Sequence, residues 1–278
     1  MNSFFNFSDF YSKMKDILQN PTKNQITEAI EINSYEYRKW FSKSIKDGEI
    51  KQSKEYYLFC SGLKYGFTNF VVDIKIKENA QQKIREIVSF FEKKNFTFLC
   101  LIGPNTQPEN IKSILLENNF CLKIREPAMA FFLDELEIKN QPLSEMEIVQ
   151  PKNQKELIDW NNVRKKVYEF PEEVISQSFL IPVLDPKVTT FLAYIEGKPV
   201  ATSLVYYYSG VAGIYSVTTL PEYRGKGIGT YMTFLTMQDA KRKGYKIMTL
   251  HSSEKGINVY KRMGFQEYSY IDYYFWRP

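Results

Sequence analysis

Three glycines within five residues, Gly225, Gly227 and Gly229, constrain the fold of this chain more than any other feature. Residues 213–217 before them are mostly apolar, β-branched or aromatic, which predicts a buried strand. Pro221 ends that strand, because proline cannot donate a hydrogen bond to a sheet. Apolar residues recur at helical spacing after the last glycine. The stretch therefore predicts a strand, a tight turn and a helix that begins at the turn.

This turn is predicted to bind a phosphate or a pyrophosphate. The first N–H groups of a helix are unpaired, and the helix dipole adds partial positive charge at that end. Glycines lack Cβ atoms, so an anion can approach these N–H groups closely. Arg224 and Lys226 add mobile positive charge beside them. The spacing fits neither a Walker P-loop nor a dinucleotide-binding fingerprint.

The turn resembles the pattern R/Q-x-x-G-x-G/A, which is the acyl-CoA pyrophosphate loop of the GNAT N-acetyltransferase superfamily. Arg224, Gly227 and Gly229 fall on its defined positions. About thirty residues later, residues 260–265 (YKRMGF) look like the Y-x-x-x-G-F ending of the family. The resemblance is specific over roughly residues 189–275.

This resemblance implies that acetyl-CoA is bound as a co-substrate, with no metal. In the family, the strand before the loop splays from its neighbour, and its free backbone groups hold the pantetheine arm and polarise the thioester carbonyl. Ser253 stands where the family often has asparagine, and Gly256 where it often has alanine. The residues so assigned to acetyl-CoA are Val217, Thr218, Thr219, Arg224, Gly225, Lys226, Gly227, Ile228, Gly229, Thr230 and Ser253.

Tyr260 matches the tyrosine that the family uses as the general acid for the departing thiolate, so Tyr260 is the candidate catalytic residue. No Asp or Glu occurs in residues 211–217, where several family members place a general base. Either a water held by Ser216 or Tyr215 takes the proton, or the substrate has a low-pKa amine. Glu222 is interpreted as a solvated loop residue.

The two halves of the chain show the same order of strands and helices, which indicates a divergent internal duplication. Residues 98–120 run parallel to residues 247–265. The first half has no glycine in residues 77–79, and Leu115 stands where the second half has Tyr260. We therefore expect the first half to bind no acyl-CoA and to pack against the second.

The predicted fold class is α/β (α+β), with two tandem GNAT-like domains, each a mixed, mostly antiparallel sheet flanked by helices. Residues 1–140 are the degenerate domain and residues 141–278 the acetyl-CoA-binding catalytic domain. Further expectations are a helix from Ser8 to about Leu18, strands over 67–76 and 128–133, and a loop or short helix over 175–186.

Composition excludes several other classes. A net charge of +5 with interspersed charges favours small anionic ligands over nucleic acid. Cys60, Cys100 and Cys121 show no metal or disulfide spacing and are interpreted as buried free thiols. His251 is the only histidine, which excludes a histidine-based triad, and it is interpreted as structural. No membrane-spanning run or signal peptide is recognised, so a cytoplasmic location is expected.

The resulting function hypothesis is transfer of an acetyl group from acetyl-CoA to a primary amine of a small molecule or peptide, by direct attack in a ternary complex. The alternative is a non-catalytic acyl-CoA-binding or regulatory protein, and the oligomeric state is left open. Most of five aromatic residues are expected in the core, with an acceptor pocket as the alternative. They are Trp160, Phe170, Phe179, Tyr206 and Tyr207.

Overall fold

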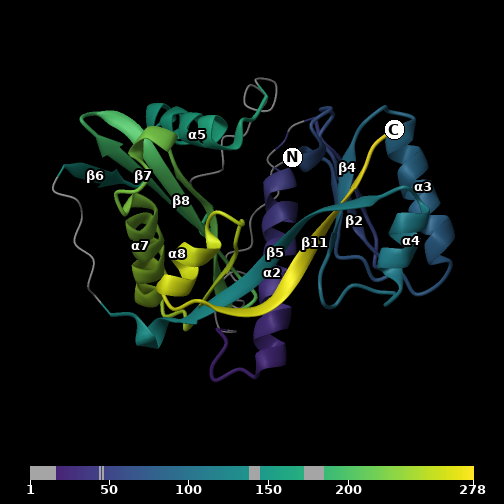
Figure 1. Cartoon of the computed structure of the whole chain (residues 1–278), viewed down its shortest axis with the longest axis horizontal. Coiled ribbons are helices and arrows are strands. Elements are labelled where there is room, and N and C mark those ends of the chain that lie inside the picture. Colours follow the sequence, from purple (N-terminus) through teal and green to yellow (C-terminus); the bar gives the residue numbers. More distant parts are fainter. Residues whose placement is uncertain (1–16, 44, 46, 138–144, 172–184) are drawn as a thin grey trace, which may run out of the picture.

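The structure is a computed structural model that describes residues 17–43, 45, 47–137, 145–171 and 185–278. Its strands join in one continuous mixed sheet, with helices on both faces (Figure 1). The elements of the first half are α2 (Lys23–Ser42), β1 (Glu49–Gln52), β2 (Tyr57–Cys60), β3 (Phe70–Val72), α3 (Ala80–Glu92), β4 (Phe98–Ile102), α4 (Ile111–Glu117) and β5 (Cys121–Phe132). Those of the second half are β6 (Met146–Val149), α5 (Gln154–Tyr168), β7 (Val188–Ile195), β8 (Lys198–Tyr208), β9 (Val211–Thr219), α7 (Ile228–Arg242), β10 (Ile247–His251), α8 (Ile257–Arg262) and β11 (Gln266–Trp276).

The two halves exchange their last strands. The strand order is β1-β2-β3-β4-β11-β5-β10-β9-β8-β7-β6. The last strand of the second half, β11, therefore pairs with β4 of the first half, while β5 of the first half pairs with β10 of the second. The two exchanged strands also pair with each other, antiparallel, across the middle of the molecule (Figure 1). Each half thus needs a strand of the other to complete its sheet.

Helix α2 spans this junction and begins at a capping box. Thr22 Oγ1 accepts a hydrogen bond from the backbone N–H of Gln25, and Gln25 Oε1 accepts one from the N–H of Thr22. Such reciprocal bonds pair two of the N–H groups that a helix leaves open at its start. Ile26 and Ile30 then pack on Ala128 of β5, at the centre of the sheet. The helix therefore covers strands of both halves.

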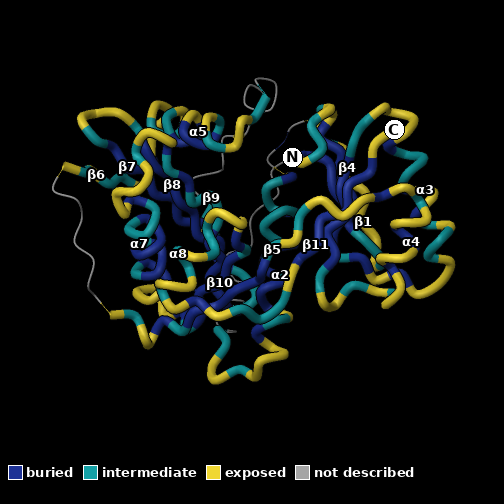
Figure 2. Tube along the Cα trace, viewed as in Figure 1, coloured by how far each residue is buried: buried dark blue, intermediate teal, exposed yellow. Residues whose placement is uncertain are grey.

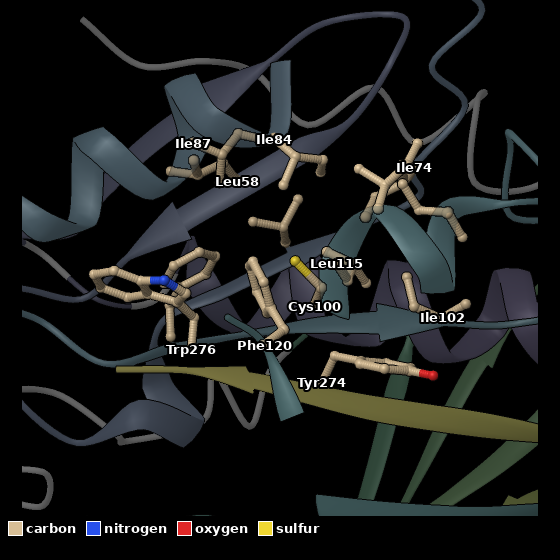
Figure 3. Close-up of a cluster of buried hydrophobic side chains, with 14 of the residues drawn as sticks. Leu58, Ile74, Ile84, Ile87, Cys100, Ile102, Leu115, Phe120, Tyr274 and Trp276 are labelled. Carbon is tan, nitrogen blue, oxygen red and sulfur yellow. The ribbon is translucent and has the colours of Figure 1, made fainter. Parts of the chain in front are cut away.

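The core of the first half shows how far the exchange extends. Tyr274 and Trp276 of β11 lie inside a cluster of first-half side chains that includes Cys100 and Phe120 (Figure 3). Phe98 stacks on Phe91 with 4.1 Å between ring centroids in the same cluster. Buried residues follow most strands of the sheet, and exposed residues lie on the outer helix faces, in loops and along β1 (Figure 2).

Several sequence-based expectations were wrong in detail. The strand expected over 67–76 is only β3, because a 3₁₀ turn (Gly66–Thr68) precedes it and Asp73 follows it at a positive φ of 56°. Strand β5 begins seven residues before the expected 128–133, because its first, mostly exposed part pairs with β11. Strand β1 is fully exposed and carries no apolar alternation, so it was not predicted.

Other sequence-based expectations can be compared with the structure only in part, because they include residues outside the described ranges. Cys60 and Cys100 are buried, whereas Cys121 is exposed, contrary to expectation, because it begins β5 at the sheet surface. The helix expected from Ser8 lies almost wholly outside the described residues. Most of 175–186 and the domain boundary at 140/141 also lie outside them.

Asp272 of β11 connects the exchanged strand to the first half. Its carboxylate accepts two hydrogen bonds from Arg125 of β5, at 2.6 and 2.8 Å, and one from Lys112 of α4, at 2.7 Å. The Asp272 side chain is only 2% exposed. Burial alone would raise its carboxyl pKa, but the bonds from Arg125 and Lys112 outweigh it and lower the pKa.

We expect Asp272→Asn to destabilise the protein at pH 7 by about 1–2 kcal/mol, less than a fully buried pair, because both cations are half-exposed and keep their hydration. A carboxyl pKa that folding lowers stabilises the native state above the unfolded pKa, roughly 4, and this gain is lost as pH falls through the folded pKa. Urea unfolding at pH 7 and pH 3 should therefore show a difference that shrinks in acid. Asp134→Asn, which breaks an exposed pair with Lys246, is the control, with an expected change under about 0.5 kcal/mol.

Candidate active site

Strand β9 carries a bulge where the site begins. In its pairing with β8, Leu204 faces Tyr215 and Thr202 faces Thr218, so one extra residue is inserted on β9. Ser216 lies there at a positive φ of 54°, which is uncommon for a residue with a side chain. Thr202 Oγ1 holds the bulge by donating to the Ser216 carbonyl at 2.8 Å. The bulge bends β9 away from its earlier direction.

Beyond the bulge, β9 is no longer paired with β10. The parallel register between them ends at Ile214 opposite Leu250, although β9 continues to Thr219. Strand β10 stays paired with β5 over its whole length, and beyond it the Ser252 N–H donates to the Pro127 carbonyl at 3.0 Å. Val217, Thr218 and Thr219 therefore lie on the open side of β9, with β8 as their strand partner. Such an opening exposes backbone groups that an extended ligand can bind.

The glycine turn follows directly after β9. Gly225 and Gly227 adopt positive φ values of 78° and 79°, a conformation that glycine adopts without steric cost. A Cβ built on either residue would have no atom within 4 Å, so the space beside the turn is open. Lys226 between them is exposed, and Arg224 Nε donates to the Thr219 carbonyl at 3.1 Å. The turn is thus an exposed backbone concavity at the end of the splayed strand.

Helix α7 begins at this turn without a side-chain cap. Gly227 is its N-cap residue and has no side chain to bond the first N–H groups. Ile228 is buried and anchors the first turn of the helix in the core, while Gly229 and Thr230 are partly exposed. Uncapped N–H groups and the positive end of a helix dipole form a favourable place for a phosphate. The start of α7 therefore leaves N–H groups open beside the turn, and binding of an anion there stays a prediction.

Tyr260 lies on α8, on the other side of the splay from β9. Its ring packs edge-on to Phe265 with centroids 5.7 Å apart, and its carbonyl accepts from the Phe265 N–H. Burial raises the pKa of the Tyr260 phenol well above its usual value, and the negative charge of Glu126 acts in the same direction. The phenol is therefore protonated at neutral pH and can donate a proton. Burial, however, makes it a weaker acid than a free tyrosine.

Two small residues, Ser253 and Gly256, lie just before the start of α8. Ser253 is exposed, and its carbonyl accepts from the N–H groups of Gly256 and Ile257 in the first turn. A Cβ on Gly256 would lie 3.0 Å from Cε2 of Tyr260, so a larger residue there would require the Tyr260 ring to shift. The glycine found where the family often has alanine thus lets the Tyr260 ring approach the helix closely.

The aromatic residues considered for an acceptor pocket are mostly core, as the sequence favoured. Trp160 and Tyr206 are about 1% exposed and pack together in one cluster. Tyr207 is buried too, and its hydroxyl donates to Asp239 at 2.6 Å. Phe170 is partly exposed and lies 5.9 Å from the Arg164 guanidinium carbon. Phe179 lies outside the described residues.

A polar cluster at the splay was missed by sequence analysis. Glu126 of β5, Tyr273 of β11 and Arg38 of α2 form one hydrogen-bonded chain, and two of them, Glu126 and Arg38, come from the first half. His251, at the end of β10, is near Arg38, and burial lowers its pKa to about 3, so it stays neutral. No sequence signal indicates this cluster, since strand exchange alone brings its members together.

Two surface hollows lie elsewhere. One of about 20 Å³ lies beside Glu31 and Asp73, and another of about 250 Å³ lies over Phe132 and Tyr268. Neither borders Tyr260, so the candidate site is defined by backbone geometry. In the described part of the chain, no three His, Cys, Asp or Glu side chains are placed to hold a metal ion. None of the described helices is both long and apolar enough to cross a bilayer.

Comparison with known proteins agrees with this geometry. Residues 154–265 match the model of the acetyltransferase (GNAT) family. A GCN5-related N-acetyltransferase from Kribbella flavida is 18% identical, with a TM-score of 0.68 over 90% of this chain and 95% of that one. A GCN5-related N-acetyltransferase from Sphaerobacter thermophilus is 14% identical, with a TM-score of 0.62 over 93% and 95%.

A third solved structure has both halves. It is a tandem GNAT protein from the clavulanic acid biosynthesis pathway, 11% identical, with a TM-score of 0.62 over 92% of this chain and 94% of that one. At these identities the likeness shows the fold, and it extends over both halves, so the first half is GNAT-like in structure. The predicted fold class is thereby confirmed. A search of curated proteins finds no match.

Proposed function

Residues 154–265 form a domain of the acetyltransferase (GNAT) family, and from this premise we propose that the protein transfers an acetyl group from acetyl-CoA to a primary amine. The acceptor is a small molecule or a peptide, and it attacks directly in a ternary complex. The observation that carries the proposal is the splay of β9 from β10 directly before an exposed turn with two left-handed glycines.

In this proposal the pyrophosphate lies on the turn. Gly225, Gly227, Ile228, Gly229 and Thr230 supply backbone N–H groups at the start of α7. The side chains of Arg224 and Lys226 add positive charge from the exposed side.

The pantetheine arm continues from the turn into the splay. There Val217, Thr218 and Thr219 bind it through backbone groups, and one of these N–H groups polarises the thioester carbonyl. Ser253 lies at the mouth of the splay and hydrogen-bonds the arm. The open space at the turn and the uncapped helix fit a diphosphate ligand.

Tyr260 is the proposed general acid. Thioester aminolysis requires that the departing thiolate gain a proton, and a partly buried, protonated phenol opposite β9 can supply it. A phenol is a weaker acid than a thiol in water, so the transfer depends on placing the two atoms in contact in a water-poor site.

We expect one coenzyme A per chain. In the first half, Asn79 precedes α3 at a positive φ, but the segment has no glycine turn, and Leu115 is a core residue where the second half has Tyr260. Isothermal titration of the full chain with coenzyme A should therefore give a stoichiometry close to one. Two equivalent sites would contradict the proposed division into a degenerate domain (1–140) and a catalytic domain (141–278).

Thiol release from acetyl-CoA with a panel of amines tests the function directly. Release that depends on both acetyl-CoA and an amine supports the transferase. Tight binding of coenzyme A without release across the panel would favour the alternative, a non-catalytic acyl-CoA-binding protein. A cytoplasmic location and the absence of nucleic-acid partners stay predictions.

A further inference from the structure

The proposed reaction has no proton acceptor in β9, and strand exchange supplies one from the first half. Glu126 lies on β5, beside the point where β10 leaves β9. Its Oε2 accepts a hydrogen bond of 2.6 Å from the Tyr273 hydroxyl, which in turn accepts one of 3.0 Å from Arg38 Nη2. Oε1 of Glu126 has no hydrogen-bond partner among the described residues, and the side chain is partly exposed. One carboxylate oxygen is therefore available for a ligand.

The strand register places Glu126 on the face of the sheet opposite Tyr260. Ala128 faces His251 across the β5–β10 pair and packs against α2. Because side chains two residues apart share one face of a strand, Glu126 also points to the α2 side. Tyr260 belongs to the cluster under α7, on the other face. A substrate bound on the Glu126 face can therefore reach a thioester on the Tyr260 face only through the opening between β9 and β10.

Strand pairing places Glu126 close to this opening, because Ala128, two residues further along β5, faces His251 at the end of β10. The negative charge of Glu126 contributes to the raised pKa values of Tyr260 and of Tyr168. Tyr168 ends α5 and also interacts with the side chain of Ser216 at the bulge. The carboxylate is thus within electrostatic range of a phenol on each side of the splay.

We propose that Glu126 binds the ammonium group of the acceptor and takes its proton, so that the first half completes the active site of the second. The inference rests on the proposed function, and it names the substrate class as a cationic primary amine. Aromatic rings beside the carboxylate support that class. Tyr37, the neighbour of Arg38 on α2, stacks on Tyr215 with centroids 3.8 Å apart, and such aromatic faces suit an organic cation.

The proton inventory of the reaction balances with these two residues. Glu126 takes one proton from the ammonium and releases it to water. The free amine nitrogen then forms a bond to the thioester carbonyl carbon. The C–S bond breaks as Tyr260 gives its proton to the sulfur, and the extra proton on nitrogen returns through water to the phenolate. The products are the N-acetyl amine, coenzyme A and one proton in solution.

The environment of Glu126 suits this role. Burial raises its carboxyl pKa, while the Tyr273 hydroxyl and the Arg38 charge lower it, and the net direction is upward. A carboxylate with a raised pKa is a better proton acceptor near neutral pH. The other groups near it on the α2 side are Arg38 on α2, Tyr168 and Arg164 on α5, Tyr273 on β11 and neutral His251 on β10, while Tyr260 lies on the opposite face. None of these is a second carboxylate.

The test compares Glu126→Gln with the wild type on two amines, tyramine and p-anisidine. Tyramine is protonated at pH 7 and p-anisidine is not, so only tyramine needs a proton acceptor before attack. We expect kcat/KM for tyramine to fall by roughly 10²-fold and that for p-anisidine to change less than threefold.

The pH profile gives a second readout. For the wild type with tyramine, kcat/KM should fall as pH drops below the Glu126 pKa, because the carboxylate becomes neutral. In Glu126→Gln this decline of kcat/KM, which comes from protonation of the carboxylate, should be absent. Asp134→Asn is the control for loss of a carboxylate.

Distinct outcomes separate the two proposals. A wild type that binds coenzyme A but acetylates neither amine nor any of a wider panel would remove the proposed function and this role together. An active wild type with an unchanged tyramine rate in Glu126→Gln would overturn the role of Glu126 alone. Equal losses on both amines would show that Glu126 is structural. Tyr273→Phe removes the hydrogen bonds to Glu126 and from Arg38 but keeps the ring, and its effect on the ratio of the tyramine and p-anisidine rates should vanish when combined with Glu126→Gln, because that ratio depends on the carboxylate.

Discussion

Gly227→Val is expected to weaken coenzyme A binding by about 10²-fold. Gly227 adopts a φ of 79°, and a β-branched residue there is strained by roughly 1–3 kcal/mol. The turn would relieve that strain by rotating, and the N–H groups at the start of α7 would then no longer converge on the diphosphate. Since a tenfold change in affinity corresponds to about 1.4 kcal/mol, strain of this size accounts for the effect. Isothermal titration with coenzyme A measures it.

Gly197→Val is the matched control for this variant. Gly197 adopts a φ of 71° in the exposed turn between β7 and β8, and a Cβ there would meet no atom within 4 Å. Its backbone strain is comparable, so both variants should lose similar thermal stability. Coenzyme A affinity should change only in Gly227→Val. Equal affinities in both variants and the wild type would place the diphosphate elsewhere.

Tyr260→Phe is expected to lower kcat by about 10²-fold or more, with coenzyme A affinity unchanged within about twofold. The substitution removes only the hydroxyl, so the contact with Phe265 persists while the thiolate loses its proton donor. Because burial raises the pKa of this phenol, the wild type should keep its donor to a pH above about 10, where a free tyrosine ionises. Steady-state rates of the wild type should therefore not decline between pH 6 and 10 through ionisation of Tyr260, and the wild type and the variant should show the same alkaline pH dependence in this range.

Tyr245→Phe is the control for the loss of a buried hydroxyl. Tyr245 lies in the same hydrophobic cluster as Tyr260, and burial raises its pKa to about 12. Its hydroxyl makes no hydrogen bond among the described residues, and its ring packs on Tyr207. We expect kcat within twofold of the wild type. A Tyr260→Phe enzyme with the same kcat as Tyr245→Phe would exclude Tyr260 as the acid.

Local chemistry allowed much of the second half to be predicted. Strand β9, the turn and α7 were located within two residues, because a proline, three glycines and helical spacing each act over a few residues. Short polar or exposed strands were not predictable in this way. Strand β1 and the first part of β5 are strands because neighbours pair with them, and pairing leaves no mark in their composition.

The sequence by itself determined the GNAT-like halves, the glycine turn at the start of α7 and the position of Tyr260, since each depends on residues close together in the chain. Only the tertiary structure decided where the two halves join and what faces the splay. Glu126 and Tyr273 are 147 residues apart, yet they share a 2.6 Å hydrogen bond because β5 and β11 pair with each other between the halves. That pairing joins strands that are far apart in the sequence, and no local pattern of residues specifies which strands become neighbours in the sheet.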